Sequence, residues 1–349
     1  MLQLVANLDC EATWAARPQP TKIRQRLATM SILLRGLVTD DEVQLHTIVA
    51  PNLEGVVDVP GLPALRWTID PRDGTTWPAA AGFAWAGSNA VRRLHYDPGH
   101  VPWRAALLQA PVSDAVAKAA NDRRLTLAVR QQAGVELPAA AVISSAAGLR
   151  AHIVQHRAQL GPGGWVCKAP WTAAGRDRVW GHDLEDTALQ RAATLLRSCG
   201  ALVFEPWLPR LLDYGVLATV DASTVTQRPP HTLLCNAHGG FTGIDMSTPE
   251  MTVAERDQII STVDTAGLAL RTLGYLGPFT IDGFFYQHQH GRALAPLCEI
   301  NARLSFGWVA LALTTRLGGT ALQIGATAPT TARMLLHPTQ RDPFAVWIE

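Results

Sequence analysis

The chain has 349 residues, of which 48% are hydrophobic and 17% charged, and its formal net charge at pH 7 is +1. A chain with this apolar content is not expected to be disordered, and it lacks the excess of basic residues that a nucleic-acid-binding surface requires. The length suffices for two or three units with sizeable cores. We therefore expect a folded protein whose partner is a small molecule or another protein, with no nucleic-acid partner.

The cysteines and the N-terminal segment indicate the compartment. The cysteines lack C-x-x-C spacing and histidines at zinc-finger intervals, so reduced core residues are expected rather than disulfides or a structural zinc site. The N-terminal segment has no basic region followed by a long apolar stretch, and no apolar run is long enough to span a bilayer. These features predict a cytoplasmic protein with no membrane partner.

The first hundred or so residues alternate short apolar strands with helical or loop segments. Residues 2–8 and 43–51 read as strands, and residues 22–37 between them have helical spacing. Residues 82–94 suggest another strand that runs into a helix, without a G-x-G-x-x-G fingerprint. This rhythm is typical of an α/β fold, but it identifies no nucleotide by itself.

The middle of the chain has a different pattern. Residues 113–144 predict two helices and a strand, with Gly134 in the position that closes the second helix. Helices are then expected at 146–160 and 184–200, and strands at 165–170 and 201–208. The stretch from about residue 125 to 204 therefore reads as a small α+β lobe inserted before a larger sheet.

The last third predicts that larger sheet. Strands are expected at 214–222, 232–244, 277–286 and 292–303, and helices at 253–274 and 306–319. A short turn joins the last two strands, so we expect them to pair as antiparallel neighbours. This pairing places Asp282 opposite or nearly opposite residues 297–299, with a bulge at Pro296.

Three polar residues occupy every second position near the end of the last strand. Successive side chains of a strand point to opposite faces, so Glu299, Asn301 and Arg303 share one surface while the residues between them face a core. Asp282 joins this surface from the neighbouring strand. Two carboxylates and an amide can hold Mg²⁺, but the same residues also fit a partly buried structural network held by Arg303.

The pattern Glu299-x-Asn301-x-Arg303, preceded by Asp282 on the adjoining strand, resembles the metal-binding signature of the ATP-grasp superfamily. Further features fall in the order of that family, and together they cover roughly residues 123–307, more than half of the chain. Each match alone would be unremarkable. Their order and spacing make the resemblance specific.

Two of these features are cations. Arg123 opens a helix that leads to a Gly-x-x-x-Pro turn and resembles the family's basic residue near the nucleotide phosphates, although a surface arginine would look the same. Lys168 resembles the strand lysine that contacts the phosphates, and on its apolar strand it needs an anionic partner. In the following glycine-poor loop, Arg176 either supplies charge to the phosphates or is solvated.

The segment 202–216 resembles the hinge strand between the two lobes of the family. The resemblance implies that the backbone at Glu205, Trp207 and Leu208 reads the adenine edge. It also implies that Asp213 binds the ribose hydroxyls, although Asp213 could instead be a turn residue.

The resemblance implies an α/β (α+β) chain with the ATP-grasp fold, in which ATP lies between two α+β lobes that follow a Rossmann-like domain. The expected limits are 1–112 for the Rossmann-like domain and 113–349 for the ATP-grasp domain. Within the latter, the small lid lobe is expected at about 125–204 and the large lobe at about 205–349.

The same resemblance implies an ADP-producing ligase that forms a C–N bond. In most of the family a substrate carboxylate attacks the γ-phosphorus of ATP, and an amine then displaces phosphate from the acyl phosphate. Asp282, Glu299 and Asn301 would hold two Mg²⁺ ions, with Mn²⁺ as an alternative, while Lys168 and Arg303 would be catalytic. The expected substrates are a small acid, such as an amino acid, and an amine, and a homodimer is a common assembly in the family.

Two other functions fit the same residues. One is a grasp-type small-molecule phosphotransferase that stops at a phosphorylated hydroxyl, and the other is a non-catalytic ATP-binding regulatory protein. The presence of three metal-type ligands together with Arg303 argues against the second. The acceptor site is less defined, and its candidates, each of which could be an ordinary structural residue, are Arg228, His231, His238, Ser305 and Phe306.

Overall fold

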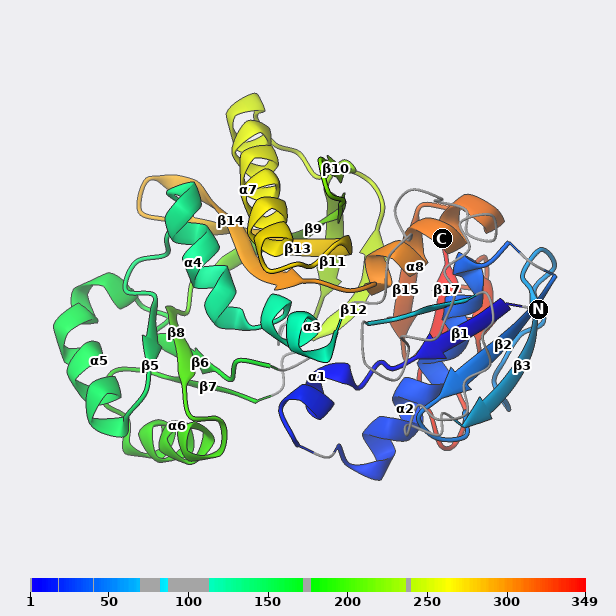
Figure 1. The fold of residues 1–349 in the computed structure, drawn as a ribbon, viewed down its shortest axis with the longest axis horizontal. Helices are drawn as coiled ribbons and strands as arrows, with labels where there is room; N and C mark the ends of the chain where they lie inside the picture. The colour runs from blue at the N-terminus through cyan, green and yellow to red at the C-terminus, as the bar shows by residue number, and fades with distance from the viewer. Residues whose placement is uncertain are drawn as a thin grey trace.

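The structure is a computed structural model of the chain and describes residues 2–17, 19–39, 41–69, 82–86, 113–171, 177–236 and 240–349. Three sheets carry the described strands and follow one another along the longest axis of the molecule (Figure 1). The N-terminal sheet lies at one end, the large sheet lies in the middle, and the small lobe with its own sheet lies at the other end.

The N-terminal sheet is parallel, with strand order β3-β2-β1-β4. It consists of β1 (Leu2–Ala6), β2 (Glu42–Thr47), β3 (Ala64–Ile69) and β4 (Gly82–Ala84), with α1 (Cys10–Trp14), α2 (Thr21–Met30) and the 3-10 helix η1 (Ser31–Leu37). Parallel neighbours need a crossover connection, and the helical segments between β1 and β2 supply it. The predicted α/β pattern of this part is confirmed. The helix expected after residue 86 lies outside the described residues.

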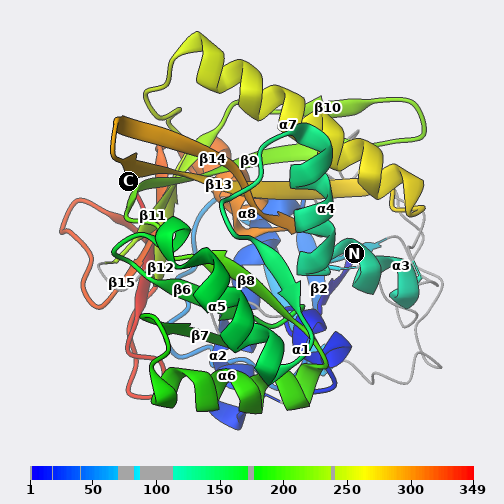
Figure 2. The same ribbon diagram turned by 90° about the vertical axis from the view of Figure 1, so that its left-hand side faces the viewer.

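The lid lobe, defined here as β5 to β8 with α5 and α6, contains an antiparallel sheet of order β5-β8-β6-β7. Its elements are β5 (Ala141–Ile143), α5 (Ala146–Leu160), β6 (Trp165–Lys168), β7 (Arg178–Gly181), α6 (Asp186–Cys199) and β8 (Leu202–Pro206). The helices cover the outer side of the sheet (Figure 2), where Trp165 and Phe204 belong to a core of the lobe itself. Alternation along β6 therefore turns Lys168 to the opposite side, toward the large sheet.

The large sheet is antiparallel, with order β14-β13-β9-β11-β12-β15-β17-β16 and β10 paired to β9. Its strands are β9 (Arg210–Val220), β10 (Val225–Gln227), β11 (His231–Cys235), β12 (Phe241–Asp245), β13 (Gly277–His288), β14 (Gly291–Asn301), β15 (Ala321–Gly325), β16 (Arg333–Leu336) and β17 (Ala345–Ile348). The accompanying helices are α3 (Asp114–Ala120), α4 (Arg123–Ala133), α7 (Val253–Thr272) and α8 (Phe306–Leu317).

Helices α4 and α7 pack together on one end of the large sheet. Val129 of α4 and Ile259 of α7 belong to the same core as Phe279 of β13 and Ile300 of β14. The predicted limits of the two lobes remain predictions, but α4 itself packs on the large sheet (Figure 1).

The first and last segments of the chain share one hydrophobic core. Leu4 and Val43 of the N-terminal sheet cluster with Trp308 of α8 and Val346 of β17. Arg316 of α8 adds hydrogen bonds to backbone carbonyls that flank the N-terminal sheet. The N-terminal part is thus built onto the large sheet, which fixes the position of α1.

Strands β13 and β14 pair in the predicted antiparallel register, with Asp282 directly opposite Glu299. Beyond this pair, residues 296–298 of β14 stand where β13 has only Gly283, which forms a bulge. Pro296 lies in this bulge, as expected for a residue that cannot donate a ladder hydrogen bond. Both the pairing and the bulge predicted from the sequence are confirmed.

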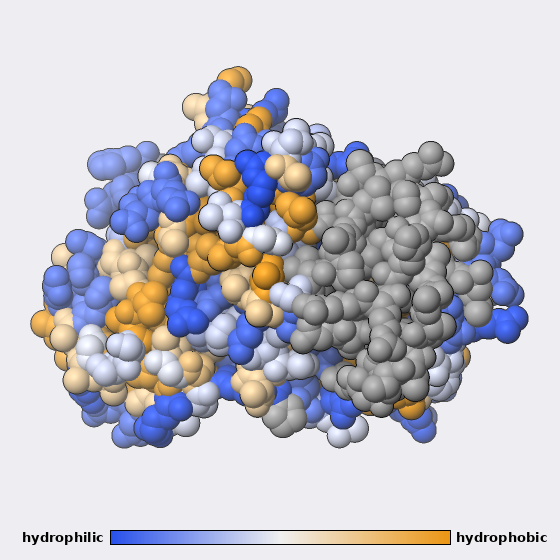
Figure 3. Space-filling view, viewed as in Figure 1, coloured by the Kyte–Doolittle hydropathy of each residue, from blue (hydrophilic) through white to orange (hydrophobic). Residues whose placement is uncertain are grey.

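No helix among the described residues is both long and apolar enough to cross a membrane. Figure 3 shows polar and apolar residues interspersed over the lid lobe and over the region of α4 and α7 on the face that it presents.

Gly134 ends α4 as predicted, with φ +66° and ψ +35° in the left-handed region. A Cβ at this position would meet no atom within 4 Å, so only backbone strain opposes a side chain. We expect Gly134→Ala to lower the free energy of unfolding by about 1 kcal/mol and Gly134→Asn to lower it by less. Urea unfolding of the three proteins measures this, and equal stabilities would contradict it.

Candidate nucleotide and metal site

Asp282 and Glu299 lie next to each other on one face of the large sheet. On β14 and just after it, Ile300 is 4% exposed and Ala302 is 0% exposed, and both belong to the core under α7. Glu299 and Asn301 therefore point to the opposite face, which Asp282 shares as the cross-strand partner of Glu299. The alternation predicted from the sequence is confirmed.

Hydrogen bonds join these side chains into one network. Asn301 Nδ2 donates to Asp282 Oδ2 at 3.0 Å, and Arg303 Nη2 donates to Asn301 Oδ1 at 2.9 Å. Arg303 also donates to Glu11 Oε1, from Nη2 at 2.6 Å and from Nε at 3.2 Å. Since Glu11 belongs to α1, the network connects the N-terminal sheet region to the large sheet.

The carboxylates in this network repel one another. Burial and the negative charge of Glu299 raise the pKa of Asp282 to about 7, although Arg303 and the hydrogen bond from Asn301 act in the opposite direction. Carboxylate and amide oxygens are the ligands that Mg²⁺ prefers, and a divalent ion would relieve the repulsion. The residues present therefore fit such an ion.

The structure limits how this ion could be held. No group of three or more His, Cys, Asp or Glu side chains that could hold a metal occurs in the part of the chain that is described. The Asn301 amide, water and substrate oxygens are further ligand types suited to such an ion beside Asp282 and Glu299. The assignment of these three residues as metal ligands remains a prediction.

Arg123 connects three elements around Glu299. It is the first residue of α4, directly after the N-cap, and is 8% exposed. Its Nη2 donates to Glu299 Oε1 at 2.8 Å, and its Nη1 donates to the carbonyl of Ala169 at 3.0 Å. Burial disfavours the positive charge of Arg123, but the negative charges of Glu299 and Glu11 outweigh this effect, so the pKa of Arg123 is raised. The guanidinium thus lies between the end of β6 and the acidic pair.

Glu205 is a buried carboxylate between two cations. It is 4% exposed on β8, where Arg130 Nη1 contacts its Oε1 at 2.5 Å and Lys168 Nζ contacts its Oε2. Burial alone would raise the pKa of Glu205, but the charges of Arg130 and Lys168 and their hydrogen bonds hold it well below its usual range. Glu205 is thus an anionic partner for Lys168, which the apolar strand was predicted to require.

Arg130 was missed by the sequence analysis. It is 1% exposed, and its guanidinium also donates to the carbonyls of Leu297 and Cys298 at 2.6 and 3.2 Å. Arg130 therefore links α4, the bulge of β14 and strand β8 of the lid lobe. The available signal was helical spacing, because Arg123 and Arg130 lie seven positions apart on one buried face of α4.

The hinge residues lie where the lid lobe joins the large sheet. The backbone N–H of Trp207 donates to the carbonyl of Gly164 at 2.9 Å, so this donor is already engaged. Leu208 packs in a small apolar cluster with Leu137 and Phe284. Asp213 forms an ion pair with Arg210. The nucleotide roles of Glu205, Trp207, Leu208 and Asp213 remain predictions.

Cations from four elements gather beside this hinge. Burial lowers the pKa of Arg178 on β7, and repulsion from Arg210 and Arg123 lowers it further. The Arg178 guanidinium lies 5.7 Å from the centroid of the Trp207 ring. Together with Lys168 on β6, these arginines make a region that favours a polyanion such as a triphosphate.

Two of the acceptor candidates lie near the acidic pair. His231 pairs with Gly215 across β11 and β9, and Gly215 pairs with Asp282 on the other side. His231 is 1% exposed, its ring nitrogens have no hydrogen-bond partner among the described residues, and burial lowers its pKa to about 4. Ser305 Oγ lies 2.8 Å from Thr280 Oγ1, just before α8.

Phe306 and Arg228 are the other acceptor candidates that the structure describes. Phe306, the first residue of α8, has its ring centroid 5.3 Å from that of Trp85. Arg228 follows directly after β10. Arg176 and His238 fall outside the described residues.

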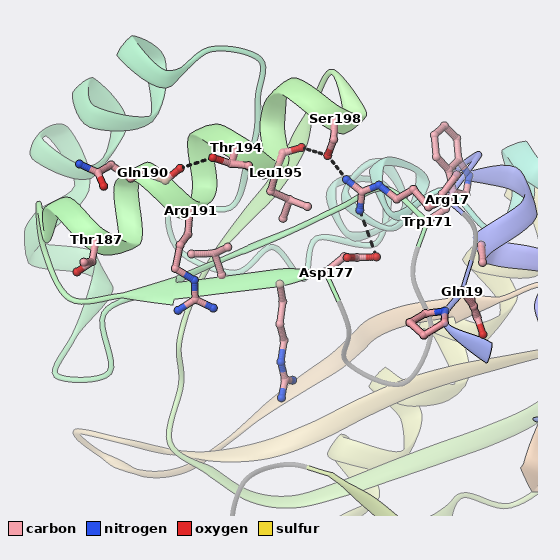
Figure 4. A pocket seen from close by; sticks show the side chains of 15 residues that line it. Arg17, Gln19, Trp171, Asp177, Thr187, Gln190, Arg191, Thr194, Leu195 and Ser198 are labelled. Atoms are coloured by element: carbon pink, nitrogen blue, oxygen red, sulfur yellow. Dashed lines mark hydrogen bonds and ion pairs between the residues drawn. The ribbon is translucent and has the colours of Figure 1, made fainter. Parts of the chain in front are cut away.

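A cavity of about 940 Å³ lies apart from the acidic pair, between α6 and the segment after α1. Figure 4 shows Arg17 reaching across one end of it, where its guanidinium contacts Ser198 and lies 3.2 Å from Asp177. Arg178 lines this cavity, whereas Arg123, Lys168 and the acidic pair of Asp282 and Glu299 do not. The predicted metal residues thus lie outside this cavity, and the candidate site at the junction of the lid lobe and the large sheet remains a prediction.

Solved structures with the same architecture come from ligases and carboxylases. The chain matches phosphoribosylamine–glycine ligase from Thermotoga maritima with a TM-score of 0.56 and 13% identity, covering 100% of this chain and 90% of that chain. It matches N5-carboxyaminoimidazole synthetase from Staphylococcus aureus in complex with ADP with a TM-score of 0.51 and 10% identity, covering 92% and 81%. Biotin carboxylase from Campylobacter jejuni gives a TM-score of 0.54 and 12% identity, covering 95% and 78%. These neighbours share one superfamily fold. The chain has the ATP-grasp fold.

The ATP-grasp fold expected from the sequence is thus confirmed, including its α+β character. No protein-family model matches the sequence, and a search of curated proteins gives no match. At such low sequence identities the structural likeness establishes the fold, while activity has to be argued from the site.

The raised pKa of Asp282 has a consequence for stability. The folded protein holds the Asp282 proton more tightly than the unfolded chain, in which the pKa of this carboxyl has its ordinary value of 3.8. The contribution of Asp282 to the free energy of unfolding therefore becomes unfavourable as the pH rises from about 4 to about 7. Without divalent ions, we expect Asp282→Asn to stabilise the protein by roughly 2 kcal/mol at pH 8 and much less at pH 4.5. Thermal unfolding at both pH values measures this. Asp264→Asn, on an exposed position of α7, is the control, and equal effects at both pH values would contradict the prediction.

Arg130 should be critical for stability because its removal leaves buried partners uncompensated. We expect Arg130→Met to lower the free energy of unfolding by about 3–5 kcal/mol. Arg124→Met is the matched control, because Arg124 is 44% exposed and pairs with Asp122 at the surface of the same helix, and its loss should cost less than about 1 kcal/mol. Urea unfolding compares the two variants. Similar stabilities would show that Arg130 is not a structural cation.

Proposed function

We propose that the protein is an ATP-dependent carboxylate–amine ligase that joins a small acid, such as an amino acid, to an amine through an acyl phosphate. The observation that carries this proposal is the network of Asp282, Glu299, Asn301 and Arg303 beside the cations of the hinge. It combines hard oxygen ligands, phosphate-binding charge and a buried arginine in one place. The proposal concerns a compound with a free carboxylate, which ATP would activate.

The neighbouring structures support the choice of reaction. The Thermotoga maritima protein is named a phosphoribosylamine–glycine ligase, and the Staphylococcus aureus structure contains ADP. Neither name defines the substrates of this chain. They do favour a ligase that consumes ATP over the other chemistries that an α/β protein could perform.

The residues have separate roles in this proposal. Lys168 and Arg123 would bind the phosphates, assisted by Arg178 and Arg210, because each brings positive charge to the junction of the lobes. Bound Mg²⁺ would neutralise the charge of the transferring phosphoryl group, and Asp282 with Glu299 would hold it. The chain itself would orient the acid and keep water away from it by means of the lid lobe.

Arg303 would act on the acid. Its side chain is 11% exposed and its guanidinium is fixed by Glu11 and Asn301, so it requires little reorganisation when negative charge develops on the carbonyl oxygen. A preorganised donor of this kind is commonly worth about 10²–10³ in rate. Nothing in this role depends on the identity of the acid.

The ligase proposal predicts ADP release that requires both an acid and an amine. The purified protein with ATP and Mg²⁺ is screened against pooled amino acids, with and without added amines, in a coupled ADP assay. We expect Glu299→Gln to lower the rate by about 10²–10³, since it removes a ligand charge, and Glu54→Gln, at an exposed position, to leave it unchanged.

Other outcomes have defined meanings. Release of ADP without an amine, together with a phosphorylated product, would favour a phosphotransferase. Absence of ADP release with every acid would contradict catalysis of this kind and would favour an ATP-binding regulatory protein.

A further inference from the structure

Glu11 is the acidic residue that α1 brings to the candidate site. It forms a buried ion pair with Arg303, with side-chain exposures of 6% and 11%. Both hydrogen bonds from Arg303 end on the same oxygen, Oε1. Among the described residues, none donates a hydrogen bond to the other oxygen, Oε2. Oε2 of Glu11 is therefore available to accept from another donor.

Arg303 has an unused hydrogen-bond donor, which complements the unused acceptor of Glu11. A guanidinium carries five N–H groups. Arg303 uses four of them, two toward Glu11, one toward Asn301 and one from Nη1 toward the carbonyl of Leu304 at 3.1 Å. One N–H on Nη1 has no acceptor in the part of the chain that is described. The ion pair thus presents one free donor and one free acceptor.

The charges around the Glu11–Arg303 pair favour a cationic ligand. The negative charge of Glu11 raises the pKa of Arg123 as well as that of Arg303, so this charge acts on both guanidinium groups. Of the three carboxylates in this cluster, Asp282 and Glu299 are assigned above to the metal ion, so Glu11 is the one that remains for a cationic ligand.

The reacting group in amide formation has an acceptor and a donor that match the free donor and the free acceptor of this ion pair. When an amine adds to an acyl carbon, that carbon bears an oxyanion and a nitrogen that still holds its protons. One free N–H donor on Arg303 and one free acceptor on the carboxylate that pairs with it match these two groups. The Glu11–Arg303 pair therefore suits the second half of the proposed reaction, not only the first.

We propose that Glu11 binds the attacking amine through Oε2, while Arg303 holds the carbonyl oxygen, which makes Glu11 the residue that selects an amine capable of carrying positive charge. This inference rests on the ligase function proposed above. The amine nitrogen forms its bond to the acyl carbon, and the bond from that carbon to the phosphate oxygen breaks with its electron pair leaving on phosphate. The proton released from nitrogen passes to Oε2 of Glu11 and from there to solvent.

The test separates binding of the amine from support of Arg303. Hydroxylamine is a largely uncharged nucleophile at neutral pH and intercepts an acyl phosphate as a hydroxamate, so it reports activation of the acid without a cationic amine. The acid and the amine are those found in the ADP-release screen. Each variant is assayed twice, with that amine and with hydroxylamine.

Glu11→Gln is the informative substitution. Glutamine keeps an oxygen that can accept from Arg303 but replaces Oε2 by an NH₂ group, which cannot accept from an amine. We expect kcat/KM for the amine to fall about 10- to 100-fold, the effect of losing a hydrogen bond to a charged group. Hydroxamate formation should stay within about threefold of wild type.

Controls keep the result interpretable. Glu255→Gln alters another arginine–glutamate pair, in which Glu255 Oε2 lies 2.6 Å from Arg292 and neither residue belongs to the proposed site, and it should change neither assay. If Glu11→Gln does not fold, Glu11→Asp keeps the charge beside Arg303 but withdraws the carboxylate by one methylene. It should also impair the amine reaction more than hydroxamate formation.

Two results would overturn the inference. An equal fall in both assays would make Glu11 a positioning residue for Arg303, and no fall in either would remove it from the reaction. A failure of the ligase proposal is recognised separately, because wild-type protein would then form no hydroxamate with any acid. In that case the proposed role of Glu11 is rejected together with the ligase proposal.

Discussion

The repulsion between Asp282 and Glu299 is the constraint around which the rest of this structure is arranged. Two carboxylates that face each other on adjacent strands are unfavourable, and the raised pKa of Asp282 expresses that cost. The chain surrounds them with cations from different elements. Arg123 comes from the start of α4 and Arg303 from the turn after β14. A site that keeps such repulsion is suited to a divalent ion.

Precise placement of these groups depends on how the sheets are joined. The N-terminal sheet shares its core with α8 and the last strands, so α1 is fixed relative to β14 and brings Glu11 to Arg303. Arg130 fixes the other side, because it contacts both the lid strand that carries Glu205 and the bulge of β14. The two lobes and the N-terminal part therefore meet through buried charge, which is costly to break and sensitive to a bound ligand.

Much of the fold and part of the site followed from local patterns. The period-two alternation at 299–303, the turn between two apolar strands and the proline at 296 predicted the pairing that the structure shows. Lys168 on an apolar strand predicted an anionic partner, and Glu205 is one. Arg130 and Glu11 were not identified, because a single charged residue on a helix is ordinary in sequence. Their roles become visible only through their partners, because Glu205 lies 75 positions from Arg130 along the chain and Arg303 lies 292 positions from Glu11.

The sequence by itself determined the order of helices and strands, the polar face of β14 and the resemblance to ATP-grasp proteins, because these depend on residues close together in the chain. The tertiary structure decided which charges meet. Ion pairs such as Glu11–Arg303 and Arg123–Glu299 join residues from separate elements, and their formation depends on the packing of whole sheets. Periodicity specifies which face of a strand or helix is buried, but it carries no information about which distant side chain will lie against that face.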